Sequence, residues 1–219
     1  MNHKLLELRA LAEVALARST ASHGLTTEDV HALSVALGAL TVHDLPALPR
    51  PEHQEPAPPK GWREVPLFVG AGVHASLFVV PAGAALPLHD HPEMTVFLRT
   101  MVGRLRIRSF DWASDVGPGL AREIANIETT PDAPPCVLLP ERGNLHAIES
   151  ASEGDSVFLD LFAPYYDDAL RPCTCYREIV GFEEQRQGER LVRLVAAPEL
   201  DPEHGPERGP EHHEPPQSA

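Results

Sequence analysis

The sequence has few cysteines, few positive charges and no long apolar run. The 219 residues include 3 cysteines. This number is small and odd, which argues against a disulfide framework. Lys and Arg total 18 against 32 Asp and Glu, a formal net charge of -14. Such a surface repels phosphate groups, so neither nucleic acid nor a membrane surface is expected as a partner.

The sequence also lacks the features of a membrane or exported protein. No stretch of about 18 uncharged apolar residues is present, so no membrane span is predicted. Glu7, Arg9 and Glu13 interrupt the apolar N-terminus where the core of a signal peptide would lie. We therefore predict a cytoplasmic protein.

Composition changes along the chain and predicts one principal domain with appendages. With 42% hydrophobic residues, 219 residues suffice for one well-buried core and are short for two. Residues 1–45 form an expected helical segment and the proline-rich residues 46–61 an expected linker. The main domain is predicted over 62–196, followed by a disordered acidic tail over 197–219 that has almost no apolar residues.

Two helices are predicted in the first segment. Residues 3–18 place apolar side chains at helical spacing, and Thr26 and Thr27 precede Glu28 and Asp29 as an N-terminal cap for a helix over 27–38. The expected apolar face of this second helix consists of Val30, Leu33, Val35, Leu37 and Leu40.

Short apolar and β-branched runs dominate the main domain. Runs such as HASLFVV, MTVFLRT, RLRIRSF and SVFLDLF alternate with Gly, Pro and Asp breaks. Strands of this length and spacing are typical of an all-β sandwich or barrel.

The stretch LPLHDHPEM contains two histidines that could bind a metal. On a strand, alternate side chains share a face, so His89 and His91 would project together and Asp90 away from them. A pair of histidines at this spacing is weak support by itself, because surface histidines often fall two apart.

The surrounding glycines strengthen the metal hypothesis. Gly83 and the two histidines give G-x5-H-x-H, which resembles the first motif of the cupin superfamily, and Gly103 closes it. The usual glutamate ligand of that motif would fall at Val96. Residues 140–146, PERGNLH, resemble the second motif with one extra residue, which makes His146 the third histidine ligand.

A site of three histidines without a carboxylate favours particular chemistry. Three neutral imidazoles leave the full charge of a divalent ion and about three open positions, by analogy with facial-triad iron sites. Such a centre can accept a thiolate, an amine and O₂ together. Zinc with three histidines and a water is the rival, and it would indicate hydrolysis or hydration.

A longer match points to one family. The run LPLHDHPEMTVFLRTMVGRLRIRSFDW (86–112) strongly resembles the thiol dioxygenases that include plant cysteine oxidases and animal cysteamine dioxygenase. The segments GNLHAI (143–148), FLDLFAPYYDD (158–168) and RPCTCY (171–176) follow in the family's order, so the resemblance spans about residues 26–180.

The resemblance implies a cupin-type β-barrel, also called a double-stranded β-helix, with an N-terminal helical segment. It implies an Fe(II) ion held by His89, His91 and His146. The reaction would add both atoms of O₂ to a thiol and give a sulfinic acid. The substrate would be a small aminothiol such as cysteamine or the N-terminal cysteine of a peptide or protein.

Two further residues are candidates for the site. Asp160 interrupts the apolar run SVFLDLF, where a buried carboxylate needs a partner. It either makes a structural hydrogen bond or, as the resemblance implies, orients the substrate amine or a histidine ligand. Tyr166 matches a family tyrosine and either lines the active site or packs on the barrel rim, while Tyr165 replaces a family proline.

Two positions depart from the family pattern. Cys173 matches a cysteine that can cross-link to a tyrosine two residues on in the animal enzyme, but Cys175 stands there, which argues against a thioether cofactor. The two cysteines are then packing residues or redox-sensitive thiols. Glu93 replaces the usual glycine after His-Pro and would alter the turn or place negative charge at the pocket mouth.

Two other function classes stay open. One is a metal enzyme of another class on the same fold, such as a zinc or nickel isomerase or hydrolase. The other is a non-catalytic cupin that binds a small ligand. The sequence specifies neither an oligomeric state nor which thiol is the substrate.

Overall fold

The structure is a computed structural model that describes residues 2–19, 24–47, 61–186 and 188–200. The predicted linker over 46–61 and the predicted tail over 197–219 lie largely outside these residues. Within the described parts of the chain, no helix combines the length and the apolar character needed to cross a membrane.

Both predicted helices are present with the expected bounds. α1 spans His3–Arg18 and α2 spans Thr27–Gly38, followed by the 3-10 turn η1 (Val42–Asp44). α1 begins where the side chain of Asn2 accepts a hydrogen bond from the backbone of Lys4. α2 begins with a reciprocal capping box between Thr26 and Asp29, which satisfies two backbone donors that a helix start otherwise leaves unbonded.

In the described parts of the chain, eleven strands form two antiparallel sheets. The first sheet has the order β1-β2-β9-β4-β7, with bounds Arg63–Val69, His74–Val80, Ser156–Ala163, Thr95–Val102 and Cys136–Leu138. The second closes on itself in the order β10-β11-β6-β5-β8-β3, with bounds Cys175–Arg186, Glu189–Ala196, Leu120–Thr129, Leu105–Trp112, Leu145–Ser150 and Ala85–His89. A last 3-10 turn, η3, spans Pro198–Leu200. The predicted all-β, cupin-type barrel with an N-terminal helical segment is confirmed.

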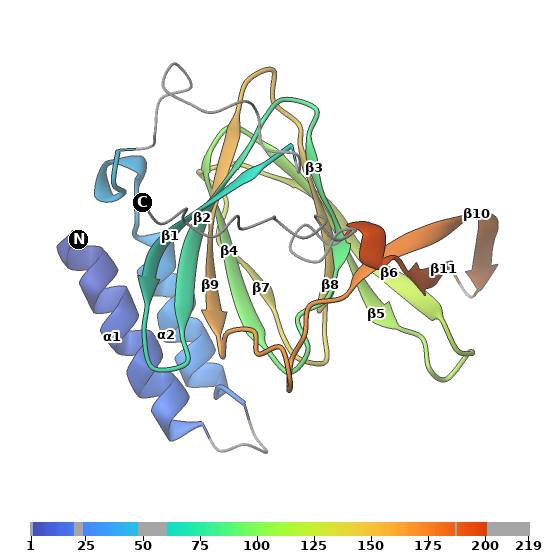
Figure 1. The fold of residues 1–219 in the computed structure, drawn as a ribbon, viewed down its shortest axis with the longest axis horizontal. Helices are drawn as coiled ribbons and strands as arrows, with labels where there is room; N and C mark the ends of the chain where they lie inside the picture. The colour runs from blue at the N-terminus through green and yellow to red at the C-terminus, as the bar shows by residue number, and fades with distance from the viewer. Residues whose placement is uncertain (1, 20–23, 48–60, 187, 201–219) are drawn as a thin grey trace, which may run out of the picture.

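The helices cover the outer face of the first sheet. In Figure 1, α1 and α2 lie side by side against β1 and β2, on the side away from β5 and β6. Their apolar faces join one core cluster with strand side chains that include Phe68, Leu77, Phe97 and Leu159. The barrel interior holds a separate core cluster.

The prediction that Val35 belongs to the apolar face of α2 is wrong. Leu33, Leu37 and Leu40 are fully buried, but the side chain of Val35 is 58% exposed. The three leucines are spaced by four and three residues and so share one helical face, whereas Val35 falls two residues from Leu33 and points away.

The core between α2 and the sheet gives a direct stability prediction. Leu33→Ala is expected to lower the free energy of unfolding by about 2–5 kcal/mol, because it removes fully buried methyl groups and leaves a cavity. Val35→Ala on the same helix is the matched control and should change stability by about 0.5 kcal/mol or less. Urea unfolding followed by circular dichroism measures both, and equal effects would contradict the assigned helix face.

The central strand β9 separates the two cores. Val157, Leu159 and Leu161 pack in the cluster beneath the helices, whereas Phe158 and Phe162 pack in the barrel interior. Because side chains alternate along a strand, Asp160 lies on the same interior side as the two phenylalanines. The fold thus places this carboxylate inside the barrel.

Candidate metal centre

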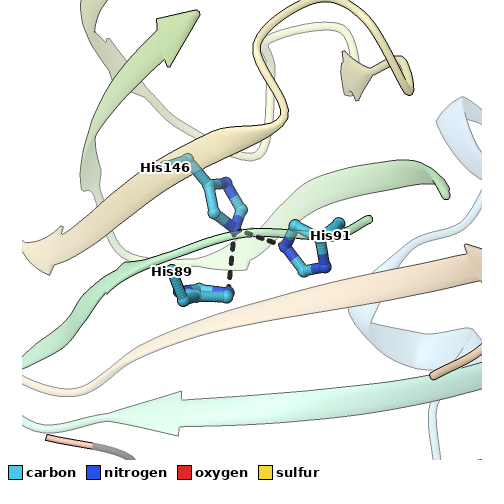
Figure 2. A group of neighbouring side chains, drawn as sticks. All are labelled: His89, His91 and His146. Carbon is cyan, nitrogen blue, oxygen red and sulfur yellow. Dashed lines mark hydrogen bonds between the residues drawn. The ribbon is translucent and has the colours of Figure 1, made fainter. Parts of the chain in front are cut away.

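The three candidate ligands come from two neighbouring strands of the closed sheet. His89 is the last residue of β3, His91 follows two residues later, and His146 is the second residue of β8. His89 and His146 are direct partners in the β3–β8 register. Figure 2 shows their imidazole rings converging from these two elements on one point.

The nitrogens that converge are the three Nε2 atoms. His146 Nε2 lies 2.9 Å from His91 Nε2 and 3.2 Å from His89 Nε2. Two metal–nitrogen bonds of about 2.0–2.1 Å at right angles place their nitrogens about 3 Å apart. All three ligand atoms lie within 4.8 Å of one another, so the arrangement fits three ligands of a single metal ion.

Hydrogen bonds at Nδ1 fix two of the rings with Nε2 as the ligand atom. His89 Nδ1 donates to the carbonyl of Pro87 at 2.8 Å. The hydroxyl of Tyr166 donates to the carbonyl of Asp90 at 2.9 Å, so it accepts its short hydrogen bond from His91 Nδ1. Carbonyl and hydroxyl partners of this kind orient metal-binding histidines and set their tautomers.

Burial keeps the ligand nitrogens able to bind a cation. The side chains of His91 and His146 are 1% and 0% exposed. Burial, more than the neighbouring rings, lowers the pKa of both histidines well below their usual range. They are therefore neutral near pH 7, which is the state that coordinates a metal. His146 Nδ1 has no hydrogen-bond partner among the described residues.

No carboxylate joins the ligand set in the described parts of the chain. The potential metal ligands that gather there are His89, His91 and His146. Val96, at the motif position of the usual glutamate, is fully buried in the apolar interior cluster. The expected three-histidine arrangement without a carboxylate is thus the one that the fold assembles.

The side chain of Asp90 points away from His89 and His91 and connects this segment to β10 by hydrogen bonds. Its carboxylate accepts hydrogen bonds from the backbone of Thr174 and from the hydroxyl of Tyr176, both at 2.8 Å. Burial raises the pKa of Asp90 despite these two bonds. Asp90 is therefore a structural residue that positions the strand end carrying both histidines.

Asn144 is a positioning residue that sequence reasoning missed. Its side chain accepts from the backbone N–H of His91 at 2.9 Å and donates to the His91 carbonyl at 2.6 Å. These two bonds connect the HDH segment to the start of β8. The only signal was its place within GNLHAI, two residues before His146.

A cavity of about 380 Å³ opens beside the histidines. Its wall contains five aromatic residues: Trp62, Phe78, Phe162, Tyr165 and Tyr166. It also contains three carboxylates, Glu64, Asp160 and Asp168, and among the described residues that line it there is no Lys or Arg. The cavity is therefore acidic and favours cationic ligands.

Asp160 and Tyr166 both face this cavity. Asp160 is 3% exposed, and its Oδ1 atom has no hydrogen-bond partner within the described structure. Burial and the negative charge of Glu64 raise the pKa of Asp160 well above its usual range. Burial also raises the pKa of Tyr166, so its hydroxyl keeps the proton that it donates to the Asp90 carbonyl.

The two cysteines lie next to the site. Cys175 is 2% exposed and pairs directly with His89 across β10 and β3, so it follows His146 and His89 in a row across three strands. Cys173 lines the cavity, and its hydrogen bond with Cys175, together with burial, raises the pKa of Cys173 far above its usual range. The thiol of Cys173 thus stays protonated near pH 7.

Glu93 occupies the turn between the histidines and β4. Its φ of 58° lies in the left-handed region that glycine favours, which explains why a glycine suits this position. The side chain is exposed and is not among the cavity-lining residues described. The geometry therefore does not support a charge at the pocket mouth, and Glu93 adopts the backbone conformation that a glycine would take in this turn.

The chain is similar in sequence to known proteins. The family model PCO_ADO matches residues 41–208. The human and mouse proteins called 2-aminoethanethiol dioxygenase are 32% and 31% identical to this chain over 179 and 182 residues. The match to the human protein covers 68% of this chain and 65% of that protein. The match to the mouse protein covers 69% of each. The chain thus spans slightly less than two thirds of the human relative.

Other proteins match a smaller part of the chain. Plant cysteine oxidase 2 of Arabidopsis thaliana is 33% identical over 128 residues, covering 51% of this chain and 46% of that protein. Among solved structures, the cupin domain of Schizosaccharomyces pombe Cnp3 overlays with a TM-score of 0.37 at 14% identity, over 48% of this chain and 65% of that one.

Proposed function

This chain belongs to the PCO_ADO family, and from that membership we propose that it is an Fe(II)-dependent thiol dioxygenase acting on an aminothiol. The observation that supports this most is the convergence of three histidine side chains, without a carboxylate, beside a cavity lined by carboxylates. The names of the relatives indicate the substrate class, 2-aminoethanethiol or a cysteine. The balanced reaction is RSH + O₂ → RSO₂H, which needs no external reductant.

In this proposal His89, His91 and His146 hold the iron through their Nε2 atoms. Iron bound there would supply coordination positions for sulfur and for O₂ and would exchange electrons between them. Tyr166 keeps the ring of His91 in the orientation that presents Nε2 to the metal.

Asp160 would orient the substrate through its amine. The carboxylate is buried beside the histidines, and one of its oxygens has no partner among the described residues. An ammonium group placed there would satisfy that oxygen and let Asp160 ionise, because an opposite charge nearby offsets the cost of burial. The aromatic walls of the cavity would keep water from the bound thiol.

Oxygen consumption tests the proposal directly. Iron-loaded protein would be mixed with cysteamine, with free cysteine and with a peptide that begins with cysteine. We expect oxygen uptake and a mass gain of two oxygen atoms on the thiol of at least one substrate. The absence of any gain on all three thiols would refute the assignment.

Metal analysis of protein purified without oxygen tests the cofactor separately. We expect iron at the three histidines. Zinc or nickel in its place would favour the isomerase or hydrolase alternative, and protein with little metal and no thiol-dependent oxygen uptake would favour a binding protein.

Tyr166→Phe tests how the metal is positioned. The change removes the hydroxyl that accepts a hydrogen bond from His91 Nδ1. Iron affinity should then fall by about tenfold, as it does when a hydrogen-bond partner of a metal-binding histidine is removed in other proteins. Competition with a chelator measures the affinity. Tyr165→Phe, whose ring stacks on His74 instead, is the control and should retain wild-type affinity. Equal affinities for wild type and Tyr166→Phe would contradict this role.

A further inference from the structure

The cavity beside the histidines continues along β9 to a second end. The ring of Phe162 lies 5.8 Å from the ring of His91, centroid to centroid, so Phe162 marks the metal end. Phe158, four residues earlier on the strand, stacks at 4.9 Å on Phe78, which lines the cavity. Since a strand rises about 3.3 Å per residue, the two levels lie roughly 13 Å apart, and Asp160 lies between them.

The wall at this second end consists of three large apolar side chains, Trp62, Phe78 and Leu86, which we call the apolar end. Each is buried, with 8%, 7% and 5% of its surface exposed, and all three belong to the core cluster of the barrel interior. The rings of Trp62 and Phe78 pack with 5.7 Å between their centroids. An apolar ligand group placed against this wall would be removed from water, which favours its binding.

The carboxylate beside the apolar end has partners of its own. Glu64 is the cross-strand partner of Phe78 and also lines the cavity. Ser76 donates to Glu64 Oε1 at 2.6 Å, and His74 Nε2 lies 3.6 Å from the same oxygen and 2.8 Å from the Ser76 hydroxyl. A ligand group at this end therefore meets apolar surface and a carboxylate that is already paired, which suits an apolar group better than a charged one.

The cavity is larger than a small aminothiol needs. Its volume of about 380 Å³ lies within the range of about 300–1,000 Å³ for pockets that enclose drug-sized ligands. Cysteamine is a short chain with a thiol at one end and an amine at the other. With its sulfur at the histidines and its amine at Asp160, it would leave the apolar end empty. A cysteine at the start of a peptide offers the same two groups, and its α-carbon also carries the rest of the chain, which would reach further along the cavity.

We propose that Trp62, Phe78 and Leu86 form a subsite for an apolar side chain at the second residue of a peptide that begins with cysteine. The proposal rests on the proposed dioxygenase function and adds a substrate preference to it. The cysteine would place its sulfur at the histidines and its amine at Asp160, and the side chain of the next residue would lie against the apolar end. The three wall residues thus determine specificity and take no part in the chemistry.

The experiment compares two dipeptide amides of nearly the same shape that differ in polarity. Cys-Leu-NH₂ carries a branched hydrocarbon where Cys-Asn-NH₂ carries an amide of similar size. With iron-loaded protein we expect kcat/KM to be about tenfold higher for Cys-Leu-NH₂, because the side-chain amide of the other peptide gives up water at the apolar end without gaining a partner. Cysteamine should also be a poorer substrate than Cys-Leu-NH₂. Equal values for the two peptides, or a higher value for cysteamine, would overturn the subsite.

Leu86→Ala and Leu88→Ala form a matched pair on β3. Both leucines are buried, at 5% and 7% exposure, but Leu86 lines the cavity whereas Leu88 packs in another core cluster. We expect Leu86→Ala to lower kcat/KM for Cys-Leu-NH₂ about fivefold more than for cysteamine, and Leu88→Ala to leave the ratio of these two substrates as in wild type. An equal loss for both substrates in Leu86→Ala, or the same change of ratio in Leu88→Ala, would overturn the subsite, because either would indicate a general structural effect.

Binding at the apolar end can be measured without turnover. Ser-Leu-NH₂, which has a hydroxyl in place of the thiol, would be added to iron-loaded protein under argon while the fluorescence of Trp62 is followed in a Trp112→Phe background. Because Trp62 belongs to the wall, we expect a saturable change, with an affinity about tenfold weaker for Ser-Asn-NH₂. No saturable change with Ser-Leu-NH₂, or equal affinity for the two peptides, would overturn the subsite whatever the activity. A wild-type protein that shows this binding preference but oxidises no thiol would support the subsite and refute the dioxygenase function instead.

Discussion

Replacing His146 by alanine is expected to abolish iron retention and, with it, all thiol oxidation. Its Nε2 atom lies within hydrogen-bond distance of the Nε2 atoms of both other histidines, so it is the common neighbour in the cluster. Removal leaves two ligands from one strand end and none from β8. Two imidazoles cannot enclose one face of the ion, so the metal should be lost on desalting.

Iron per chain, measured after anaerobic loading and desalting, checks this result. His31→Ala is the matched control, since His31 is an exposed residue of α2. His146→Gln fills more of the buried space and guards against a folding defect, which circular dichroism of the metal-free proteins would reveal. Iron bound to folded His146→Ala at the wild-type level would refute His146 as the third ligand.

The helices and strands could be predicted because their patterns are local. Leu33 and Leu37 recur at the spacing of one helical face, and the alternation in β9 places Asp160 on the side of Phe158. Val35 shows the limit, because an apolar residue near such a face need not belong to it. The pair of histidine ligands could be predicted for the same reason, since HDH at the end of a strand directs His89 and His91 to one side.

Contacts between distant strands could not be predicted. The bonds of Asn144 to His91 join residues 53 apart, and that of Asp90 to Thr174 joins residues 84 apart. They depend on which strands pair and in which register, and no local pattern encodes that. The connection from His74 through Ser76 to Glu64 is hidden for the same reason, because β1 and β2 must pair in one register to form it.

The register also explains the apolar residue at the expected ligand position. Val96 on β4 pairs with Phe162 on β9, and Leu98, two residues on, pairs with Asp160. The acid thus faces the interior from the strand beside β4, outside the group of potential metal ligands. In the proposed function, a carboxylate on β9 instead of β4 would contact the substrate and leave a coordination position of the metal open.

Asp160→Asn is expected to lower kcat/KM for cysteamine by about 100-fold, the scale of loss when a reacting group is mispositioned. The amide has nearly the same shape as the carboxylate but cannot carry the charge that an ammonium group needs. Iron content should remain at the wild-type level, because Asp160 is not among the gathered metal ligands. The variant should thus separate metal binding from substrate orientation.

The same substitution should stabilise the protein as pH rises. Burial raises the pKa of Asp160 in the folded state above its ordinary value of 3.8, so the folded protein holds this proton more tightly than the unfolded chain does. Stability from this group is therefore present below the ordinary pKa and is lost as pH rises toward the folded-state pKa. Asparagine has no such proton, so its advantage in Tm over wild type should grow as the pH rises above the ordinary pKa of 3.8 toward the folded-state pKa.

Asp155→Asn, in the exposed turn before β9, controls for the loss of one negative charge and should show neither effect. A lower Tm for Asp160→Asn would mean that the carboxylate makes a stabilising bond, which would return it to the structural role that its sequence position also allowed. Wild-type activity with higher stability would mean that the charge is not used by the substrate. Only loss of activity together with higher stability fits a buried carboxylate whose partner arrives with the substrate, since such a group is costly until that partner binds.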